Sequence, residues 1–150
     1  MILISHRGNL TGPDKSLENK PEYILKAISS GFDCEIDLWK SDEGLFTGHN
    51  NAQYKISSDF LLNKSKNLWI HCKNYDSILW CVKYSMLNYF WHETDKITLT
   101  SKNFIWAYPG NQPIKDSIAV LPERFDENQL NQCKGICSDY IIEYKAYENI

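Results

Sequence analysis

The sequence predicts an α/β fold in which parallel strands, joined by helices, surround one hydrophobic core. Strand-like and helix-like segments alternate along the chain, and polar residues follow several of the strands. We expect about eight short strands and only three or four helices. A full (β/α)8 TIM-type barrel takes about 250 residues. The 150 residues of this chain therefore predict a single domain, residues 1–150, that forms a compact or reduced (β/α)8 barrel with several helices replaced by loops.

The N-terminal half has the clearest patterns. Met1–Ser5 is an apolar run that predicts a short buried strand, and Phe32–Trp39 predicts a second strand. Between them, Pro21 suits the first turn of a helix that Gly31 is placed to end. The other elements expected in this half are a strand at Leu45–His49, a small helix at Ser57–Leu62 and a strand at Leu68–Lys73.

The C-terminal half has weaker signals. Asp76–Tyr84 has a helical pattern, and Phe104–Tyr108 can form a hairpin with the strand before it. The other expected elements are strands at Tyr89–His92, Ile97–Thr100, Ser117–Leu121 and Gly135–Tyr140, and a short helix at Glu127–Lys134.

Composition argues against several classes of protein. The net charge of −3 and the lack of a dense Lys/Arg cluster argue against a nucleic-acid partner. No apolar run approaches the roughly 20 residues that span a bilayer, and the first five residues lack the features of a signal peptide. The five cysteines are an odd number and fit small buried side chains in a reducing compartment. We therefore expect a cytoplasmic protein without a membrane span.

Two carboxylates in an apolar strand are the first candidate site. Glu35 and Asp37 are two residues apart, so both point to one face of the predicted strand, whereas Cys34, Ile36 and Leu38 point to the other. Neighbouring carboxylates repel each other and lose hydration when buried, so they need a compensating cation or proton. A divalent metal ion with oxygen ligands would provide that compensation.

A later strand repeats the arrangement with basic residues, because His71 and Lys73 also share one face. His6 and Arg7 lie where the first strand ends, and His49 lies at the end of the third. An arginine can bind a phosphate group, while one imidazole takes a proton and another gives one. These residues predict a site for a phosphate ester.

The motifs resemble those of the glycerophosphodiester phosphodiesterase family, whose barrel is shared by phosphatidylinositol-specific phospholipases. The family has His-Arg-Gly after its first strand, Glu-Asn before its first helix, Glu-x-Asp on its second strand and His-Asp after its third. The corresponding segments of this chain are His6-Arg7-Gly8, Glu18-Asn19, Glu35-Ile36-Asp37 and His49-Asn50. The resemblance covers roughly residues 1–50 and weakens towards Trp69–Lys73.

The resemblance implies metal-assisted hydrolysis of a small phosphodiester, in which a cyclic phosphate can form first. The implied catalytic acid/base pair is His6 and His49, and the implied phosphate ligands are Arg7 and Lys73. The implied metal ligands are Glu35 and Asp37, with His71 in the third position, and Glu18 and Asn19 would orient the site. The implied partner is a small-molecule phosphodiester.

The chain departs from the family at the third metal ligand, where His71 replaces the usual glutamate. The resemblance implies one divalent cation, Mg²⁺ or Ca²⁺, whereas the imidazole makes Mn²⁺ or Zn²⁺ possible. Two alternatives stay open: a non-catalytic descendant that binds a phosphorylated ligand, and a lyase that stops at the cyclic product. A site role is also open for His92 and Asp139, which lie at the ends of predicted strands. The oligomeric state is not predicted.

Overall fold

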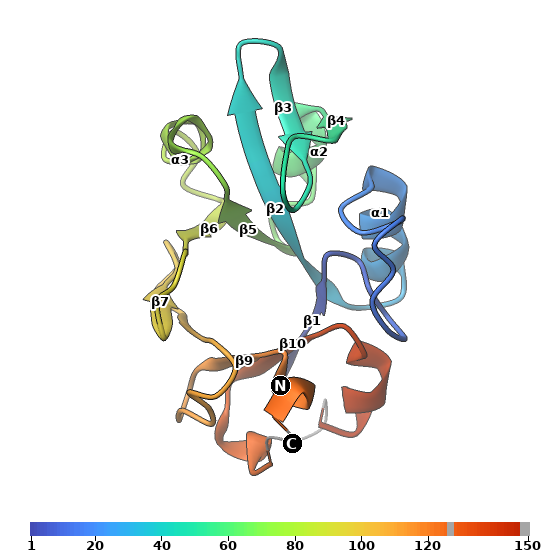
Figure 1. Cartoon of the computed structure of the whole chain (residues 1–150), viewed down its shortest axis with the longest axis vertical. Helices are drawn as coiled ribbons and strands as arrows, with labels where there is room; N and C mark the ends of the chain where they lie inside the picture. The colour runs from blue at the N-terminus through green and yellow to red at the C-terminus, as the bar shows by residue number, and fades with distance from the viewer. Residues whose placement is uncertain (126–127, 148–150) are drawn as a thin grey trace.

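The computed structural model describes residues 1–125 and 128–147, which contain one mixed sheet of ten strands that curls on itself (Figure 1). The strands are β1 (Ile2–His6), β2 (Asp33–Ser41), β3 (Gly44–Thr47), β4 (Tyr54–Ile56), β5 (Leu68–Cys72), β6 (Asn88–Trp91), β7 (Ile97–Leu99), β8 (Ile105–Ala107), β9 (Ile118–Val120) and β10 (Gly135–Ser138). The α-helices are α1 (Pro21–Ser29), α2 (Ser58–Asn63) and α3 (Tyr75–Cys81), and the 3-10 helices are η1 (Pro122–Phe125), η2 (Leu130–Gln132) and η3 (Ile141–Tyr147).

The centre of the sheet is parallel. The neighbouring strands β6, β5, β2, β1, β10, β9 and β8 are parallel in that order. The pairs β2–β3, β3–β4 and β7–β8 are antiparallel. Because parallel strands all run the same way, their carboxyl ends meet at one end of the curled sheet.

The prediction of a reduced (β/α)8 barrel is wrong. Within the described residues, α-helices connect β1 to β2 and β5 to β6, and α2 precedes β5 after the β3–β4 hairpin. No α-helix lies between β6 and β10 in those residues, where β7 forms an antiparallel hairpin with β8. The segment 108–117 between the parallel strands β8 and β9 is too short to add a packed helix. The fold is therefore a curled mixed sheet and not an alternating barrel.

Most predicted elements are present, with shifted ends. Pro21 begins α1, and Gly31 follows its end with a φ of +93° that favours glycine. Helix α3 has a capping box between Asn74 and Ser77, and Phe104–Tyr108 contains β8 of the predicted hairpin. Strand β4 and helix η3 were not predicted. Of the helix expected at Glu127–Lys134, Glu127 lies outside the described residues, and the remainder contains the short η2.

The two faces of β2 separate the core from the candidate site. Its side chains Cys34, Ile36 and Leu38 are buried in the cluster that joins the sheet to the helices. The helices lie outside the curl of the sheet (Figure 1). A second cluster fills the interior of the curl with Ile4, Trp69, Phe90, Trp106, Ile118, Val120, Leu121 and Cys137. Apolar side chains from β1, β5, β6, β8, β9 and β10 thus pack inside the curl beneath the polar residues at the carboxyl ends of the strands.

All five cysteines are buried, as predicted. The Sγ atoms of Cys72 and Cys81 lie 3.9 Å apart, well beyond the roughly 2.05 Å of a disulfide bond. No helix in the described part of the chain combines the length and apolar character that crossing a bilayer requires.

A candidate metal and phosphate site

The predicted site residues meet at the carboxyl ends of the parallel strands. His6 ends β1, Glu35 and Asp37 lie on β2, and His71 lies on β5. Asp37 faces His71 directly in the β2–β5 register, and His6 faces Glu35 in the β1–β2 register. Polar groups on adjacent parallel strands therefore point to one face at the same level. This is why residues distant in sequence come together here.

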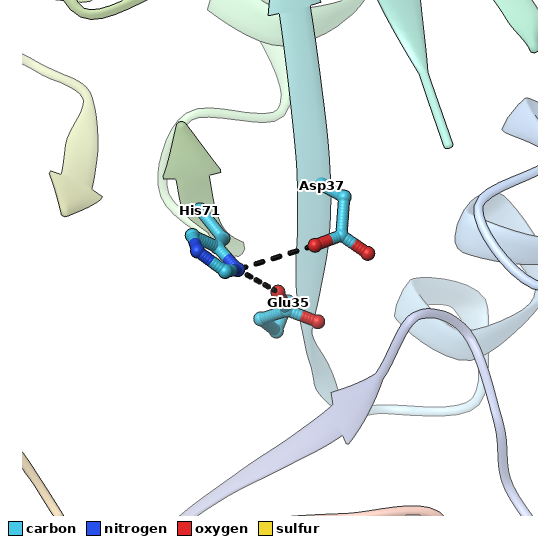
Figure 2. A group of neighbouring side chains, drawn as sticks. All are labelled: Glu35, Asp37 and His71. Atoms are coloured by element: carbon cyan, nitrogen blue, oxygen red, sulfur yellow. Dashed lines mark ion pairs between the residues drawn. The ribbon is translucent and has the colours of Figure 1, made fainter. Parts of the chain in front are cut away.

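Glu35, Asp37 and His71 form a compact group of possible metal ligands (Figure 2). One ligand atom from each residue lies within 4.8 Å of the other two. The His71 Nδ1 atom is 3.2 Å from Asp37 Oδ1 and 3.9 Å from Glu35 Oε1. All three residues are buried, and Asp37 has no exposed surface. The group has the donor atoms of a small divalent-cation site with mixed nitrogen and oxygen ligands.

The tautomer of His71 is set by its second ring nitrogen. His71 Nε2 lies 3.2 Å from the carbonyl oxygen of His92, and a carbonyl can only accept a hydrogen bond. Nε2 therefore carries a hydrogen, and Nδ1 is the ring atom that faces the two carboxylates. Nδ1 can donate a hydrogen to Asp37 or, without that hydrogen, offer its lone pair to a cation. Histidine ligands of metals commonly donate their other N–H to a backbone carbonyl in this way.

The two carboxylates have opposite electrostatic environments. Burial, followed by repulsion from Asp37, raises the pKa of Glu35 well above its ordinary value. Burial alone would raise the pKa of Asp37, but contacts from His49 and His71 and the charge of Arg7 place it well below its ordinary value. Glu35 Oε2 and Asp37 Oδ1 are buried and receive no hydrogen bond. Two such oxygens beside an imidazole lone pair fit a bound cation.

Two basic side chains lie beside the carboxylates. Arg7 Nε is 2.9 Å from Asp37 Oδ2, and Lys73 Nζ is 3.6 Å from Asp37 Oδ1. Burial lowers the pKa of Arg7, but the carboxylates around it, led by Asp37, raise that pKa above its ordinary value. Both side chains also line the main cavity. They are therefore two basic side chains that a phosphate group in this cavity could meet.

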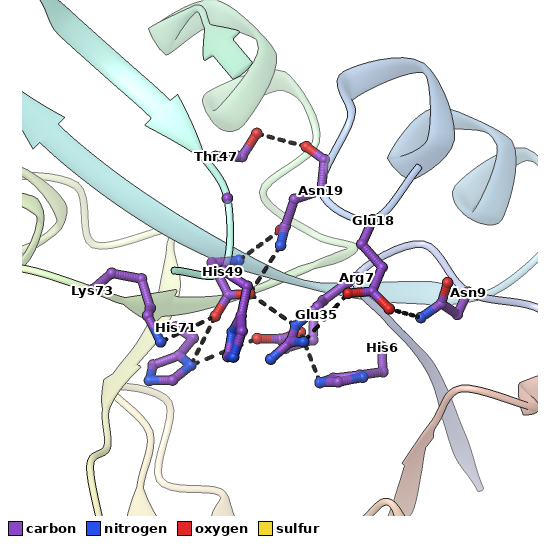
Figure 3. A network of polar contacts seen from close by, with 12 residues as sticks. His6, Arg7, Asn9, Glu18, Asn19, Glu35, Thr47, His49, His71 and Lys73 are labelled. Carbon is purple, nitrogen blue, oxygen red and sulfur yellow. Dashed lines mark hydrogen bonds and ion pairs between the residues drawn. The ribbon is translucent and has the colours of Figure 1, made fainter. Parts of the chain in front are cut away.

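Glu18 and Asn19 hold this arrangement from the loop before α1 (Figure 3). Glu18 Oε2 is 3.4 Å from Arg7 NH1. The Asn19 amide donates to Asp37 Oδ2 and accepts from the Asp37 backbone N–H, both at 2.9 Å. Asn19 is fully buried with a φ of +66°, and Thr47 Oγ1 donates to its carbonyl. These contacts fix the positions of Arg7 and Asp37, as expected for orienting residues.

Asp139 is the partner of His6. It follows β10, and its Oδ1 atom is 2.7 Å from His6 Nδ1 and accepts a second bond from the Asn9 amide at 2.8 Å. Burial would raise the pKa of Asp139, but the hydrogen bond and charge of His6, the bond from Asn9 and the charge of Arg7 together lower it. An ionised Asp139 accepts the Nδ1 hydrogen of His6, so in the neutral ring the lone pair lies on Nε2, on the side away from Asp139. The Nε2 atom is 3.9 Å from Glu35 Oε2. The sequence signal for Asp139 was only its place near the end of the last predicted strand.

His49 reaches the site from the loop after β3. Its side chain is 44% exposed, and its Nδ1 atom is 3.5 Å from Asp37 Oδ2. The preceding Gly48 has a φ of +149°, and a Cβ there would lie 2.2 Å from the Asn51 carbonyl oxygen. Trp39 Nε1 donates to the Gly48 carbonyl at 2.6 Å. This loop therefore requires glycine, and it holds His49 at the solvent side of Asp37.

One cavity of about 480 Å³ joins these groups. Its lining includes His6, Arg7, Glu35, His49, His71 and Lys73. The cavity also contains His92, whose ring stacks on Tyr108 with centroids 3.4 Å apart. Burial, followed by the charge of His71, lowers the pKa of His92 to about 4. His92 is thus a neutral part of the wall at neutral pH.

No protein-family model, curated protein or solved structure matches this chain. The similarity to glycerophosphodiester phosphodiesterases therefore rests on the motif residues alone.

Proposed function

We propose that this protein is a small phosphodiesterase that uses one divalent metal ion and a pair of histidines. The proposal is carried by one observation: Glu35 and His71, which form a buried group of possible metal ligands with Asp37, line one cavity with three basic side chains and three further histidines. Hydrolysis of a phosphodiester needs cations for the phosphate oxygens, a group that accepts a proton and a group that donates one. The motif resemblance to glycerophosphodiester phosphodiesterases supports the same chemistry.

Glu35, Asp37 and His71 would hold the metal ion. The fit rests on the two carboxylate oxygens that receive no hydrogen bond and on the Nδ1 lone pair of His71. When bound, the ion would neutralise charge on the phosphate oxygens. The imidazole favours Mn²⁺ or Zn²⁺ over the Mg²⁺ or Ca²⁺ implied by the family resemblance, because nitrogen ligands suit the transition metals.

The protein's own residues would perform the proton transfers. Arg7 and Lys73 bind the phosphate oxygens, and His6 Nε2 takes the proton of the attacking hydroxyl while Asp139 holds its Nδ1 hydrogen. His49 gives a proton to the leaving oxygen and is re-protonated from solvent through its exposed face. One P–O bond forms and one breaks, so water and a diester give a monoester and an alcohol. A substrate hydroxyl as nucleophile would first give a cyclic phosphate.

Two alternatives use the same cavity. A lyase would stop at the cyclic phosphate, which phosphorus NMR of the products would distinguish from a monoester. A non-catalytic binder of phosphorylated ligands is favoured by one observation: Arg7, His71 and Lys73 all contact Asp37 directly. Cationic side chains can therefore compensate part of the buried charge without a metal ion.

The proposed compartment is the cytoplasm, because the cysteines are buried as thiols and a reducing environment maintains that state. The proposed partner is a small phosphodiester, with no nucleic acid.

The test is turnover of a chromogenic diester and a panel of glycerophosphodiesters by metal-stripped protein, with Mg²⁺, Ca²⁺, Mn²⁺ and Zn²⁺ restored separately. We expect turnover only with a restored ion, highest with Mn²⁺ or Zn²⁺, and we expect His6→Ala to abolish it. The exposed Tyr75→Ala variant is the matched control and should retain the parent rate. Folded protein that turns over no diester with any ion would refute the proposal in favour of the binder.

A further inference from the structure

The cavity of the candidate site has two chemically different halves. The basic, acidic and imidazole groups come from β1, β2, β5 and the loop after β3. The opposite half comes from β6, β8, β9 and the residues that follow them. Its apolar lining includes Phe90, Trp106, Tyr108, Val120 and Leu121, and its polar lining is His92, Glu93 and Arg124. The volume of about 480 Å³ corresponds to about sixteen water molecules at roughly 30 Å³ each. A phosphate group and a metal ion would leave much of this space for an ester group.

The apolar half begins directly at the proposed metal ligand. The ring of His71 stacks on Phe90 with centroids 5.1 Å apart and an angle of 12° between the planes. Phe90 in turn contacts Trp106, with ring centroids 4.7 Å apart. His92 and Tyr108 form a second stack in the same cavity. An ester group of a phosphate held near His71 would therefore lie against aromatic rings.

Leu121 gives independent support for an apolar wall. It follows β9, its side chain is buried, and its backbone has a φ of +48°. A left-handed conformation is unfavourable for a bulky L-residue, and glycine or asparagine would adopt it more easily. Residues in strained conformations cluster at functional sites. A leucine at this position places an apolar side chain in the cavity wall at a conformational cost.

We propose that the site selects a phosphodiester that carries an uncharged planar ring on one ester, for which a phenyl ester is the simplest representative. The inference rests on the proposed function, since it requires phosphate to bind in this cavity. A planar ring gains stacking contacts with aromatic walls that glycerol does not gain. A quaternary ammonium group would also suit aromatic rings. The basic side chains of Arg7, Lys73 and Arg124 outnumber the carboxylates Glu35 and Glu93 in the cavity lining and disfavour a cationic ester there.

The test is calorimetric binding of phenyl phosphate, glycerol phosphate, phosphocholine and inorganic phosphate to the Mn²⁺-loaded protein. Phenyl phosphate should bind about tenfold more tightly than glycerol phosphate. Tyr108→Leu should remove most of this difference and leave the affinity for inorganic phosphate unchanged, because it takes away a ring that lines the cavity and stacks on His92. The Tyr108 hydroxyl has no hydrogen-bond partner among the described residues, so the fold should tolerate leucine there. Tyr75→Ala removes an exposed aromatic ring outside the cavity and should keep the preference.

Each outcome separates the inference from the proposed function. If inorganic phosphate fails to bind the folded protein, the proposed function is wrong and the inference falls with it. If phosphate binds but phenyl phosphate binds no more tightly than glycerol phosphate, only the inference is overturned. Tighter binding of phosphocholine than of phenyl phosphate would also overturn it. Preference for the phenyl ester in the parent, lost in Tyr108→Leu, would support it.

Discussion

Replacing Asp139 by asparagine tests how His6 is held. Asp139 Oδ1 accepts bonds from His6 Nδ1 at 2.7 Å and from the Asn9 amide at 2.8 Å. An asparagine keeps the size of the side chain but loses the negative charge, and its amide nitrogen cannot accept a hydrogen bond. Hydrogen bonds to charged groups contribute about 1.5–3 kcal/mol. If this interaction orients His6 in the transition state, turnover should fall about 10-fold to 150-fold, at about 1.4 kcal/mol for each factor of ten.

The assay for Asp139→Asn is steady-state hydrolysis of a chromogenic diester at saturating Mn²⁺. We expect kcat to fall while KM and the affinity for Mn²⁺ stay close to the parent values, because Asp139 contacts neither the phosphate ligands nor the metal ligands. The exposed Asp42→Asn variant removes the same charge away from the cavity and should have the parent kcat. An unchanged kcat in Asp139→Asn would refute the positioning role, and an equal loss in Asp42→Asn would point to net charge instead.

Three further predictions concern the buried charges. Glu35→Gln should abolish Mn²⁺ binding yet stabilise the metal-free protein by on the order of 1 kcal/mol, because it removes a buried charge that is poorly compensated; calorimetry and thermal melting measure both, and a lower melting temperature would contradict this account. His71→Glu should shift the ion that best supports turnover towards Mg²⁺ or Ca²⁺, and an unchanged order of ions would show that His71 is not a ligand. Because the folded-state pKa values of Asp37 and Asp139 are lowered, their stabilisation is present above the unfolded pKa of about 3.9 and is lost as pH falls through the folded values. Asp139→Asn should therefore weaken the decrease in melting temperature between about pH 5 and pH 2, and a decrease as steep as the parent's would argue against this contribution.

The sequence predicted the N-terminal half of the site because the needed signals are local. Glu35 and Asp37 alternate with apolar residues on β2, and this period of two places them on one face whatever the rest of the fold does. His6 follows one apolar run and His71 lies near the end of another. Parallel pairing of β1, β2 and β5 brings these two positions together. The order of the motifs added the loop residues Glu18 and Asn19.

The remaining features depend on contacts between distant segments. Asp139 lies 133 positions from His6, and only the pairing of β1 with β10 brings the two together. The apolar wall from β6, β8 and β9 has the same sequence pattern as core, so its place in the cavity lining could not be predicted. The barrel prediction failed because strand count and length do not specify the connections. The short link between β8 and β9 leaves no room for a covering helix.

Titration of the metal-stripped protein with Mn²⁺, followed in one sample by calorimetry and by diester turnover, tests the central claim most directly. The account predicts saturable binding of one ion per chain, with activity that rises in proportion to occupancy. It also predicts that Glu35→Gln loses both signals while it remains folded. Turnover that is complete before any ion is added, or that stays absent when the site is saturated, would contradict the claim that Glu35, Asp37 and His71 form the metal site of a phosphodiesterase.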